Sequence, residues 1–408
     1  MTDTARASFR ILVHDYAGHP FQVQLSRWLA GRGHAVLHLF SGDVETPRGA
    51  LARRADDPAG FAVEPVSLGR PFAKYDLARR WLQERAFGTA LARRAASFRP
   101  DVVLSANAPP AVQARLAAAL RTGGVPLVCW VQDIFTLGVD AALRGKPAPV
   151  RSLARGLVRR LEFGAMRRAA GIVAISEDFV PILEAHGISP GGVPVEIIEN
   201  WAPLGEIRPV GRDNPWSRAH GLDGRFVFLT AGTLGLKHNP GHLAALARAF
   251  RDDPEVRVVV VSQGVGRARL EEERRRDGLD NLVLLDFQPF ERLPEVLATA
   301  DVAVVLLEDY AGSLSVPSRV YSHFCAGRPL LASVPRANLA RRLVEREGAG
   351  LCADPGDVEG FVAAARRLRA DPALRARMAE AQRRYAAGAF DIDRIGPRFE
   401  SVLARAVT

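Results

Sequence analysis

The sequence has only three cysteines, Cys129, Cys325 and Cys352, and they are scattered through apolar stretches. This excludes a disulfide framework and offers no metal-ligand spacing, so we predict buried free thiols. The sequence also lacks a run of about eighteen apolar residues, which excludes a transmembrane helix. Its first residues carry no apolar signal core and lead into an expected strand, so we expect a cytoplasmic protein.

Acidic residues are in the minority, with 45 Asp and Glu against 55 Lys and Arg and a formal net charge of +10. That charge suits nucleic acid, an anionic membrane surface or anionic substrates. We find no nucleic-acid motif, no zinc spacing and no aromatic and basic platform, so nucleic acid is not an expected partner. The basic stretch Arg151–Arg168, with leucines interleaved, is either a solvated surface helix or a surface that meets anionic lipid or an anionic acceptor.

A length of 408 residues suggests two or three domains, and 48% hydrophobic residues is typical of a globular protein. Residues 9–14 and 35–40 are expected strands on either side of a helix at residues 21–31. The chain therefore opens with a βαβ unit and a parallel sheet. The first loop carries a single glycine, Gly18, so it lacks the dinucleotide-binding pattern G-x-G-x-x-G.

A second α/β half follows a region without clear periodicity. Residues 202–224 are rich in Pro, Gly and charge and are the predicted linker. The alternation of strands and helices restarts at residues 226–230, and a tail of helices is expected from about residue 335 to the end. The predicted fold class is α/β, with two doubly wound Rossmann-like domains facing a cleft.

The most informative stretch, Val316–Ser333, follows an apolar run that predicts a buried strand. Pro317 suits the first turn of a helix, and Ser315 or Ser318 suits a cap for that turn. Arg319 falls in the same turn, where free N–H groups and the helix dipole favour an anion such as a diphosphate. An ordinary βαβ unit whose polar loop binds nothing explains the pattern equally well.

Four segments follow one another in a distinctive order and spacing: Arg32–Val36, Gly232–Lys237, Gln263–Arg267 and Ala326–Ala332. Together they resemble the "rGHeV" segment, the second-domain opening, the "GdGp" turn and the "AxGxPVIA" ending of family 4 glycosyltransferases, which have the GT-B fold. Three further elements resemble the branch that builds bacterial capsule, exopolysaccharide and O-antigen repeats: Val316–Tyr321, Gln132–Asp133 and Asn200–Trp201.

The resemblance covers nearly the whole chain. It implies an acceptor-binding Rossmann-like domain at residues 1–205, a nucleotide-sugar-binding one at 206–387, and a helix at 388–408 that crosses back to the first. It also implies a retaining reaction with no metal and no cofactor. The nucleotide sugar, UDP- or GDP-linked, is then a substrate.

The sequence departs from the family pattern at several positions. Thr233 stands where the second-domain loop usually has an Arg, so only Lys237 remains of the usual basic pair. The usual E-x7-E pair would fall at Leu314 and Ser322, and Gln132 replaces a first-domain His. The roles usually given to those residues are therefore not carried over. Related sequences with Lys in the Pro-Ser-Arg position suggest that Arg319 supplies the missing positive charge.

Transfer from a nucleotide sugar requires stabilisation of the diphosphate that leaves as the glycosidic bond breaks. We predict Lys237 and Arg319 as the fixed cations for it, with a surface lysine as the alternative for Lys237. Asp133 is predicted to orient the acceptor or the sugar, with a capping carboxylate as the alternative; for Arg267 the alternative is a solvated charge. The donor-binding residues are predicted from the loops and helix starts of the second half: Gly232, Thr233, Gly235, Gly264, Arg267, Ser315 and Ser318. The predicted acceptor-side residues are Gly18, His19 and Asn200.

With this resemblance, the sequence predicts a glycosyltransferase that acts in cell-surface polysaccharide synthesis. It would move a sugar from a nucleotide-sugar donor to a lipid-linked or saccharide acceptor. It would be cytoplasmic and peripheral at the inner face of the membrane. Two alternatives remain open at this point. One is a nucleotide-sugar epimerase of the same shape, and the other is a catalytically silent homologue that binds a nucleotide sugar or a partner.

Overall fold

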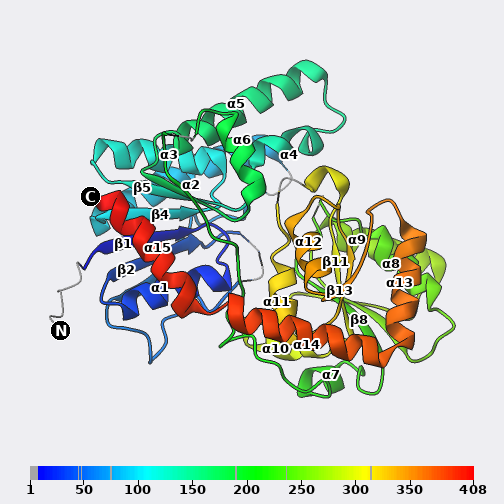
Figure 1. The fold of residues 1–408 in the computed structure, drawn as a ribbon. Helices are drawn as coiled ribbons and strands as arrows, with labels where there is room; N and C mark the ends of the chain where they lie inside the picture. The colour runs from blue at the N-terminus through cyan, green and yellow to red at the C-terminus, as the bar shows by residue number, and fades with distance from the viewer. Residues whose placement is uncertain are drawn as a thin grey trace. The chain divides into compact units, whose positions relative to one another are not determined.

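The structure, a computed structural model, describes residues 8–44, 46, 48–73, 76–188, 191–235, 237–312 and 315–408. Two compact units make up the chain (Figure 1): Met1–Glu199 with Ile392–Thr408 form the first, and Asn200–Asp391 form the second. None of the helices in the described ranges has both the length and the apolar character needed to cross a membrane.

The first unit is built on a sheet of seven parallel strands in the order β3-β2-β1-β4-β5-β6-β7. The strands are β1 Arg10–Asp15, β2 Ala35–Ser41, β3 Phe61–Val66, β4 Val102–Ala106, β5 Leu127–Val131, β6 Gly171–Ala174 and β7 Val195–Ile197. The five residues of β4 and of β5 are all buried, which explains why each strand is an unbroken apolar run. The strand order reverses between β1 and β4, where open α/β sheets usually bind ligands.

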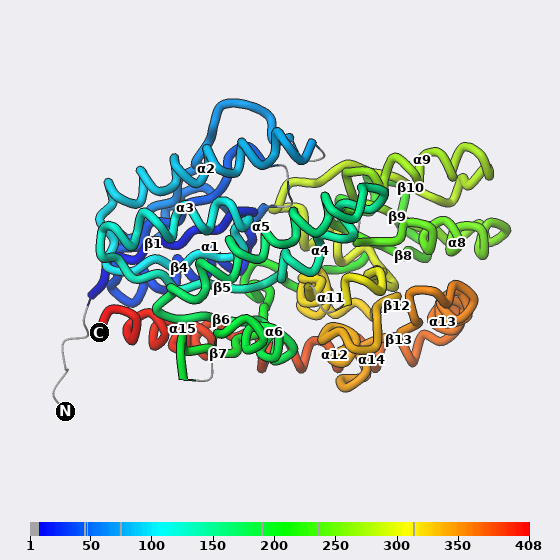
Figure 2. Tube along the Cα trace, turned by 90° about the horizontal axis from the view of Figure 1, so that it is seen from above, coloured from blue at the N-terminus to red at the C-terminus, as the bar shows by residue number. Residues whose placement is uncertain are grey.

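Helices cover both faces of this sheet. They are α1 Pro20–Gly31, α2 Leu77–Phe98, α3 Pro110–Thr122, α4 Phe135–Ala142, α5 Ala148–Met166, α6 Val180–Glu184 and α15 Ile392–Val407. The last helix, α15, packs on α1, β4 and β5 (Figure 2). Trp28 Nε1 donates a 2.7 Å hydrogen bond to Asp393 Oδ1, and the rings of Trp130 and Phe399 lie 4.6 Å apart between centroids. The C-terminal helix is therefore part of the first unit's core.

The second unit has a six-stranded parallel sheet in the order β10-β9-β8-β11-β12-β13. Its strands are β8 Phe226–Ala231, β9 Val256–Val261, β10 Leu282–Leu285, β11 Val302–Leu306, β12 Leu330–Ser333 and β13 Gly350–Ala353. Its helices are α7 Pro215–Ala219, α8 Gly241–Ala249, α9 Val265–Asp277, α10 Leu293–Ala298, α11 Arg319–Ala326, α12 Leu339–Arg346, α13 Val358–Ala370 and α14 Pro372–Ala389. The reversal of strand order lies between β8 and β11, and the stretch singled out by sequence follows β11.

The two doubly wound sheets confirm the predicted α/β fold class, with local corrections. The expected tail of helices was wrong at Gly350–Ala353, which forms the edge strand β13. Only Ala353 of these four residues is fully buried, so the strand lacks a strong apolar pattern. Cys352 is only partly buried, whereas Cys129 and Cys325 are buried as predicted.

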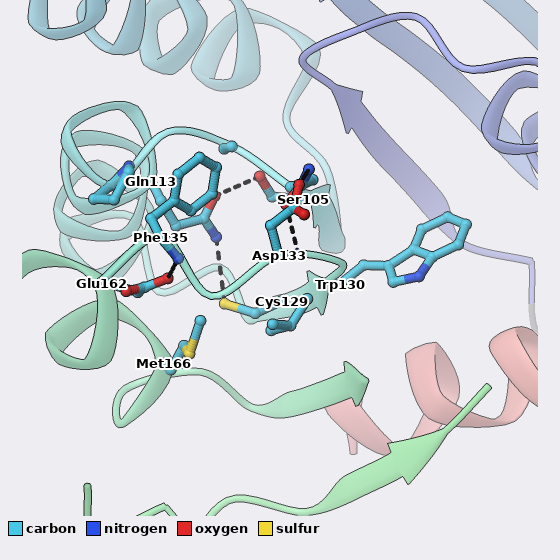
Figure 3. A pocket seen from close by; sticks show the side chains of 12 residues that line it. Ser105, Gln113, Cys129, Trp130, Asp133, Phe135, Glu162 and Met166 are labelled. Carbon is cyan, nitrogen blue, oxygen red and sulfur yellow. Dashed lines mark hydrogen bonds between the residues drawn. The ribbon is translucent and has the colours of Figure 1, made fainter. Parts of the chain in front are cut away.

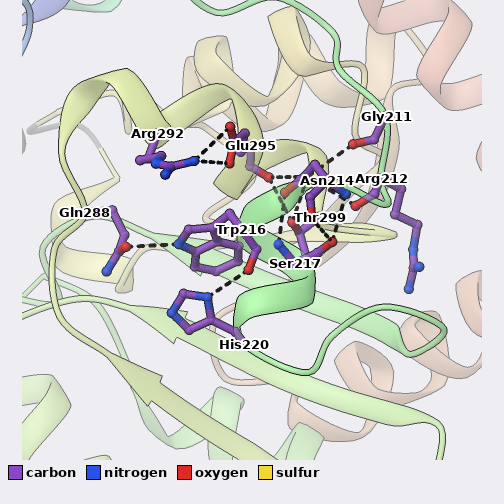
Figure 4. Close-up of polar contacts among 10 residues, drawn as sticks. All are labelled: Gly211, Arg212, Asn214, Trp216, Ser217, His220, Gln288, Arg292, Glu295 and Thr299. Carbon is purple, nitrogen blue, oxygen red and sulfur yellow. Dashed lines mark hydrogen bonds and ion pairs between the residues drawn. The ribbon is translucent and has the colours of Figure 1, made fainter.

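The predicted linker contains the short helix α7, which is fixed in the second unit by side chains (Figure 4). Asn214 Oδ1 accepts from Ser217 N at 2.9 Å, and the Asn214 Nδ2 group donates to Glu295 O at 3.0 Å. Trp216 Nε1 donates to Gln288 Oε1 at 3.0 Å. An N-cap with a capping box thus explains why this Pro-rich region forms a helix without helical periodicity.

Candidate active site

The loop that leaves β8 in the second unit passes close to the side chain of Arg319. Gly232 has φ +123°, and a Cβ added to it would lie 3.4 Å from Arg319 Nη2. A side chain at this position would meet both an unfavourable backbone conformation and the guanidinium. The backbone conformation therefore favours glycine here, while the 3.4 Å distance is an ordinary van der Waals contact.

Arg319, the first residue of α11, is held by two neutral acceptors. Its Nη1 donates to Thr230 Oγ1 at 3.2 Å, and its Nη2 donates to Thr233 O at 2.8 Å. Burial lowers the pKa of Arg319 to about 10, still well above neutral pH. Among the residues that the structure describes, Arg319 forms no ion pair. Arg319 is partly buried, and a cation that loses part of its hydration without gaining a carboxylate is costly to maintain; such groups concentrate at binding sites.

Lys237 approaches the same region from the β8–α8 loop. Its Nζ donates a 2.9 Å hydrogen bond to the hydroxyl of Ser315, which is buried. Ser315 is positioned in turn by Asn338, whose Nδ2 group donates to Ser315 O at 2.9 Å. Burial lowers the pKa of His238 most, and the charges of Arg319 and Lys237 lower it further, so the two predicted cations lie near one imidazole.

The glycine-bearing loops of the second unit pack against each other. Gly264, with φ +106°, precedes α9. A Cβ on Gly266 would lie 2.8 Å from Leu234 Cβ, so the two loops touch. Gly235 donates its N–H to His238 Nδ1 at 3.1 Å. The backbone of Arg267 joins this group, since its N–H donates to Gly264 O at 3.1 Å, but its side chain lies near Asp286, with Nη2 3.8 Å from Asp286 Oδ1.

The start of α11 differs from the predicted cap. The helix begins at Arg319, so Pro317 precedes it, and Ser318 occupies the N-cap position without a side-chain cap hydrogen bond. Val320 N and Tyr321 N instead donate to the carbonyls of Pro317 and Ser318, at 3.1 Å each. Ser318 is exposed. The family's E-x7-E pair would fall at Leu314 and Ser322, neither of which is acidic. Leu314 lies outside the described residues, as do Ser313 and Leu236.

In the first unit, Asp133 is paired with Asn107 just beyond the ends of β5 and β4. Asn107 Nδ2 donates to Asp133 Oδ2 at 2.8 Å, and Asp133 N donates to Asn107 Oδ1 at 3.1 Å. Asn107 itself has φ +44°, which is uncommon for a residue other than glycine. Asp133 lines a cavity of about 30 Å³ with Ser105 and Gln113 (Figure 3), and this volume is large enough for a water molecule.

Gly18 and His19 lie in the β1–α1 loop, which is organised by Asp15. Asp15 Oδ1 accepts from Gly18 N at 2.9 Å and from Ala17 N at 3.2 Å. Burial raises the pKa of Asp15 to about 7, although these hydrogen bonds oppose the shift. The ring of His19 stacks on Phe21. Asn200 is buried in the segment that opens the second unit.

Sequence reasoning missed several groups that organise these loops, including His238, Asn338 and Asp15. His238 had one available signal, since it directly follows Lys237 in a glycine-bearing loop. The contacts of Asn338 and Asp15 become visible only when distant residues meet. In the described part of the chain, no cluster of three or more His, Cys, Asp or Glu side chains is arranged to hold a metal ion.

The architecture of two Rossmann-like units defines the class of protein. HepE from Anabaena, solved in complex with UDP-glucose, is 18% identical with a TM-score of 0.70, over 97% of this chain and 99% of that one. At this identity the likeness shows the GT-B fold alone.

Family models identify the chain within that class. Residues 22–204 match Glycosyltransferase Family 4, and residues 213–385 match Glycosyl transferases group 1. The chain belongs to the family 4 glycosyltransferases of the GT-B fold.

Two curated relatives match part of the chain. WcaI of Escherichia coli (strain K12), named as a colanic acid biosynthesis glycosyl transferase, is 25% identical over 62% of this chain. WbjE of Pseudomonas aeruginosa, named as a probable glycosyltransferase, is 27% identical over 64% of this chain. The matches span 61% of WcaI and 64% of WbjE, which is less than two thirds of each.

Proposed function

We propose that the protein transfers a sugar from a UDP- or GDP-linked donor to a lipid-linked or saccharide acceptor in cell-surface polysaccharide synthesis. The family supports the reaction class, and the name of WcaI supports the setting. HepE, which shares the fold, was solved with UDP-glucose, and this supports a nucleotide-sugar donor. Retention of the anomeric configuration and independence from metal are parts of the same proposal.

The single observation that carries the proposal is the pair of cations at the β8–α8 and β11–α11 loops. Arg319 is partly buried and donates to two neutral oxygens, and Lys237 donates to Ser315, four residues before Arg319 in the chain. When the glycosidic bond breaks, its electron pair passes to a diphosphate oxygen and negative charge grows there. Fixed cations stabilise the diphosphate more in the transition state, where its negative charge grows, than in the ground state, where the same group carries less charge.

Gly232 contributes by bringing backbone to the same place. Without a side chain, its peptide can lie beside Arg319 and leave room for a phosphate oxygen. Lys237 and Arg319 would together supply the positive charge that a metal ion supplies in other transferases. The reaction would then need no resident cofactor.

The experiment is transfer of radiolabel from a panel of UDP- and GDP-linked sugars to a membrane lipid extract. Labelled lipid or saccharide product supports the proposal. An isomerised nucleotide sugar formed without acceptor would establish the epimerase alternative. Binding of a nucleotide sugar with neither reaction would establish the catalytically silent alternative.

We also propose that the first unit binds the anionic inner face of the cell membrane through the N-terminal half of α5. Exposed apolar side chains lie there at helical spacing, with Val150 at 49%, Leu153 at 76% and Leu157 at 45% exposure. Arg159 and Arg160 are exposed next to them. An amphipathic basic helix binds anionic lipid by combining apolar insertion with charge attraction. This surface would hold the enzyme near a lipid-linked acceptor.

A further inference from the structure

His238 lies directly after Lys237 and is 8% exposed. The backbone N–H of Gly235 donates to His238 Nδ1 at 3.1 Å. Because a backbone N–H can only donate, Nδ1 must carry a lone pair. Burial and the nearby cations Arg319 and Lys237 lower the pKa of His238 well below its usual 6.5, so the ring is neutral. A neutral imidazole with a lone pair on Nδ1 carries its proton on Nε2.

The proton on Nε2 faces another donor. His238 Nε2 lies 3.4 Å from Arg319 Nη2, and a guanidinium has no acceptor. Nη2 already donates to Thr233 O. Among the described residues, no oxygen forms a hydrogen bond with His238 Nε2. Two donors that converge in a buried place, without a carboxylate, are arranged for an acceptor from outside the chain.

We infer that the Nε2–H of His238 donates to a phosphate oxygen of the leaving diphosphate, beside the guanidinium of Arg319. The inference rests on the proposed function. It adds one hydrogen-bond donor, His238 Nε2–H, to the two cations Lys237 and Arg319 on which that proposal depends. No proton is transferred: the glycosidic bond breaks, its electron pair goes to the diphosphate oxygen, and the hydrogen bond strengthens as charge grows there. The Gly235 N–H fixes the tautomer, so the loop itself sets the direction of the donor.

A purely structural role for His238 predicts something different. In that case Nδ1 accepts from the Gly235 N–H and supports the turn, and the Nε2–H group makes no contact with a ligand. Two substitutions separate the cases. His238→Asn keeps an acceptor near Nδ1 and removes the Nε2 donor, whereas His238→Gln places an amide donor near Nε2 and gives up the acceptor near Nδ1.

Isothermal titration with inorganic pyrophosphate, UDP and GDP tests the inference on the full chain, with the melting temperature as a check of folding. We expect His238→Asn to weaken pyrophosphate binding roughly tenfold or more, the effect of one hydrogen bond to a charged group. His238→Gln should recover most of that loss, and binding of uridine or guanosine alone should not change. His220→Asn, at the C-cap of α7 in the same unit, is the matched control and should bind like the unaltered protein.

Nitrogen-15 chemical shifts of the imidazole provide a second readout, independent of binding. We expect an Nε2–H tautomer in the free protein, and a proton on Nδ1 would overturn the inference. So would pyrophosphate affinity that falls in Lys237→Ala but changes less than twofold in His238→Asn; the proposed function would then stand without His238. Absence of pyrophosphate, UDP and GDP binding by the unaltered protein would overturn both.

Discussion

Arg319 and Gly232 lie in contact across the end of the second sheet, although they are far apart in the sequence. The position of a Cβ on Gly232 is 3.4 Å from Arg319 Nη2. The β8–α8 loop and the start of α11 therefore form one surface, and the backbone of the loop positions the guanidinium. A substitution at Gly232 should therefore affect Arg319 without removing Thr230 Oγ1 or Thr233 O, the two acceptors of its guanidinium.

We predict that Gly232→Ala both destabilises the second unit and weakens binding of UDP or GDP. A φ of +123° is unfavourable for alanine, at a cost of about 1–3 kcal/mol, and relief of that strain would shift the loop against which the guanidinium lies. Urea denaturation and titration calorimetry measure the two effects. Gly356→Ala, in the β13–α13 loop of the same unit, is the matched control, because an added Cβ there meets nothing within 4 Å and its φ is not positive. Equal effects of the two changes would contradict the assigned role of Gly232.

The buried carboxyl group of Asp15 predicts a pH-dependent stability. Burial raises its pKa from 3.8 to about 7, so the native state holds this proton more tightly than the unfolded chain. Stability from this group is therefore full below about pH 4 and falls as the pH rises through 7, by on the order of a few kcal/mol. Asp15→Asn removes the loss and keeps the Oδ1 acceptor for Gly18 N.

We expect Asp15→Asn to raise the melting temperature at pH 8 by more than it does at pH 5. His14 and His38 also have pKa values lowered by burial, to about 3, but both proteins contain them, so their contribution largely cancels. An increase that is the same at both pH values would show that Asp15 does not titrate in this range.

Packing of α15 predicts a steric effect at Gly396. A Cβ on Gly396 would overlap the ring of Trp28 on α1. Gly396→Ala should therefore destabilise the first unit by about 1–3 kcal/mol, as measured by urea unfolding. Gly156→Ala provides the control, since an added Cβ in α5 meets nothing within 4 Å and alanine favours helix. A neutral Gly396→Ala would contradict the packing of α15 described above.

The exposed apolar face of α5 predicts reduced vesicle binding when it is made acidic. Leu153→Asp with Leu157→Asp should lower binding to vesicles of anionic phospholipid roughly tenfold or more, because each leucine contributes about 1.5–3 kcal/mol when fully buried. Co-sedimentation with vesicles measures this. Leu82→Asp is the control, as Leu82 is 63% exposed on α2. An equal loss of vesicle binding in Leu82→Asp would show that the net charge of the protein, rather than the apolar face of α5, determines binding.

Much of the fold could be predicted from sequence because its buried strands are short apolar runs bounded by Gly and Pro. Strands such as Val302–Leu306 are buried on both faces and contain no polar residue. The strand Gly350–Ala353 was missed because it is a short edge strand with three partly buried residues. Helix α7 was missed because its side-chain cap, rather than any periodicity, defines it.

The candidate site was predicted in outline and not in its contacts. Glycines, a lysine and an arginine near strand ends indicate an anion site, and the structure brings Gly232, Lys237 and Arg319 into one region. The tautomer of His238 could not be predicted, because it depends on the direction of the Gly235 N–H. The roles of these residues in transfer stay predictions.

The most direct test of the diphosphate site compares kcat/KM for donor-to-acceptor transfer in Lys237→Ala and Arg319→Ala. The site predicts a fall of roughly a hundredfold or more in each, the scale seen when one group that stabilises transition-state charge is removed. Their melting temperatures should change little, and Lys146→Ala, an exposed lysine of the first unit, should transfer normally. Unchanged turnover in both variants would contradict the account.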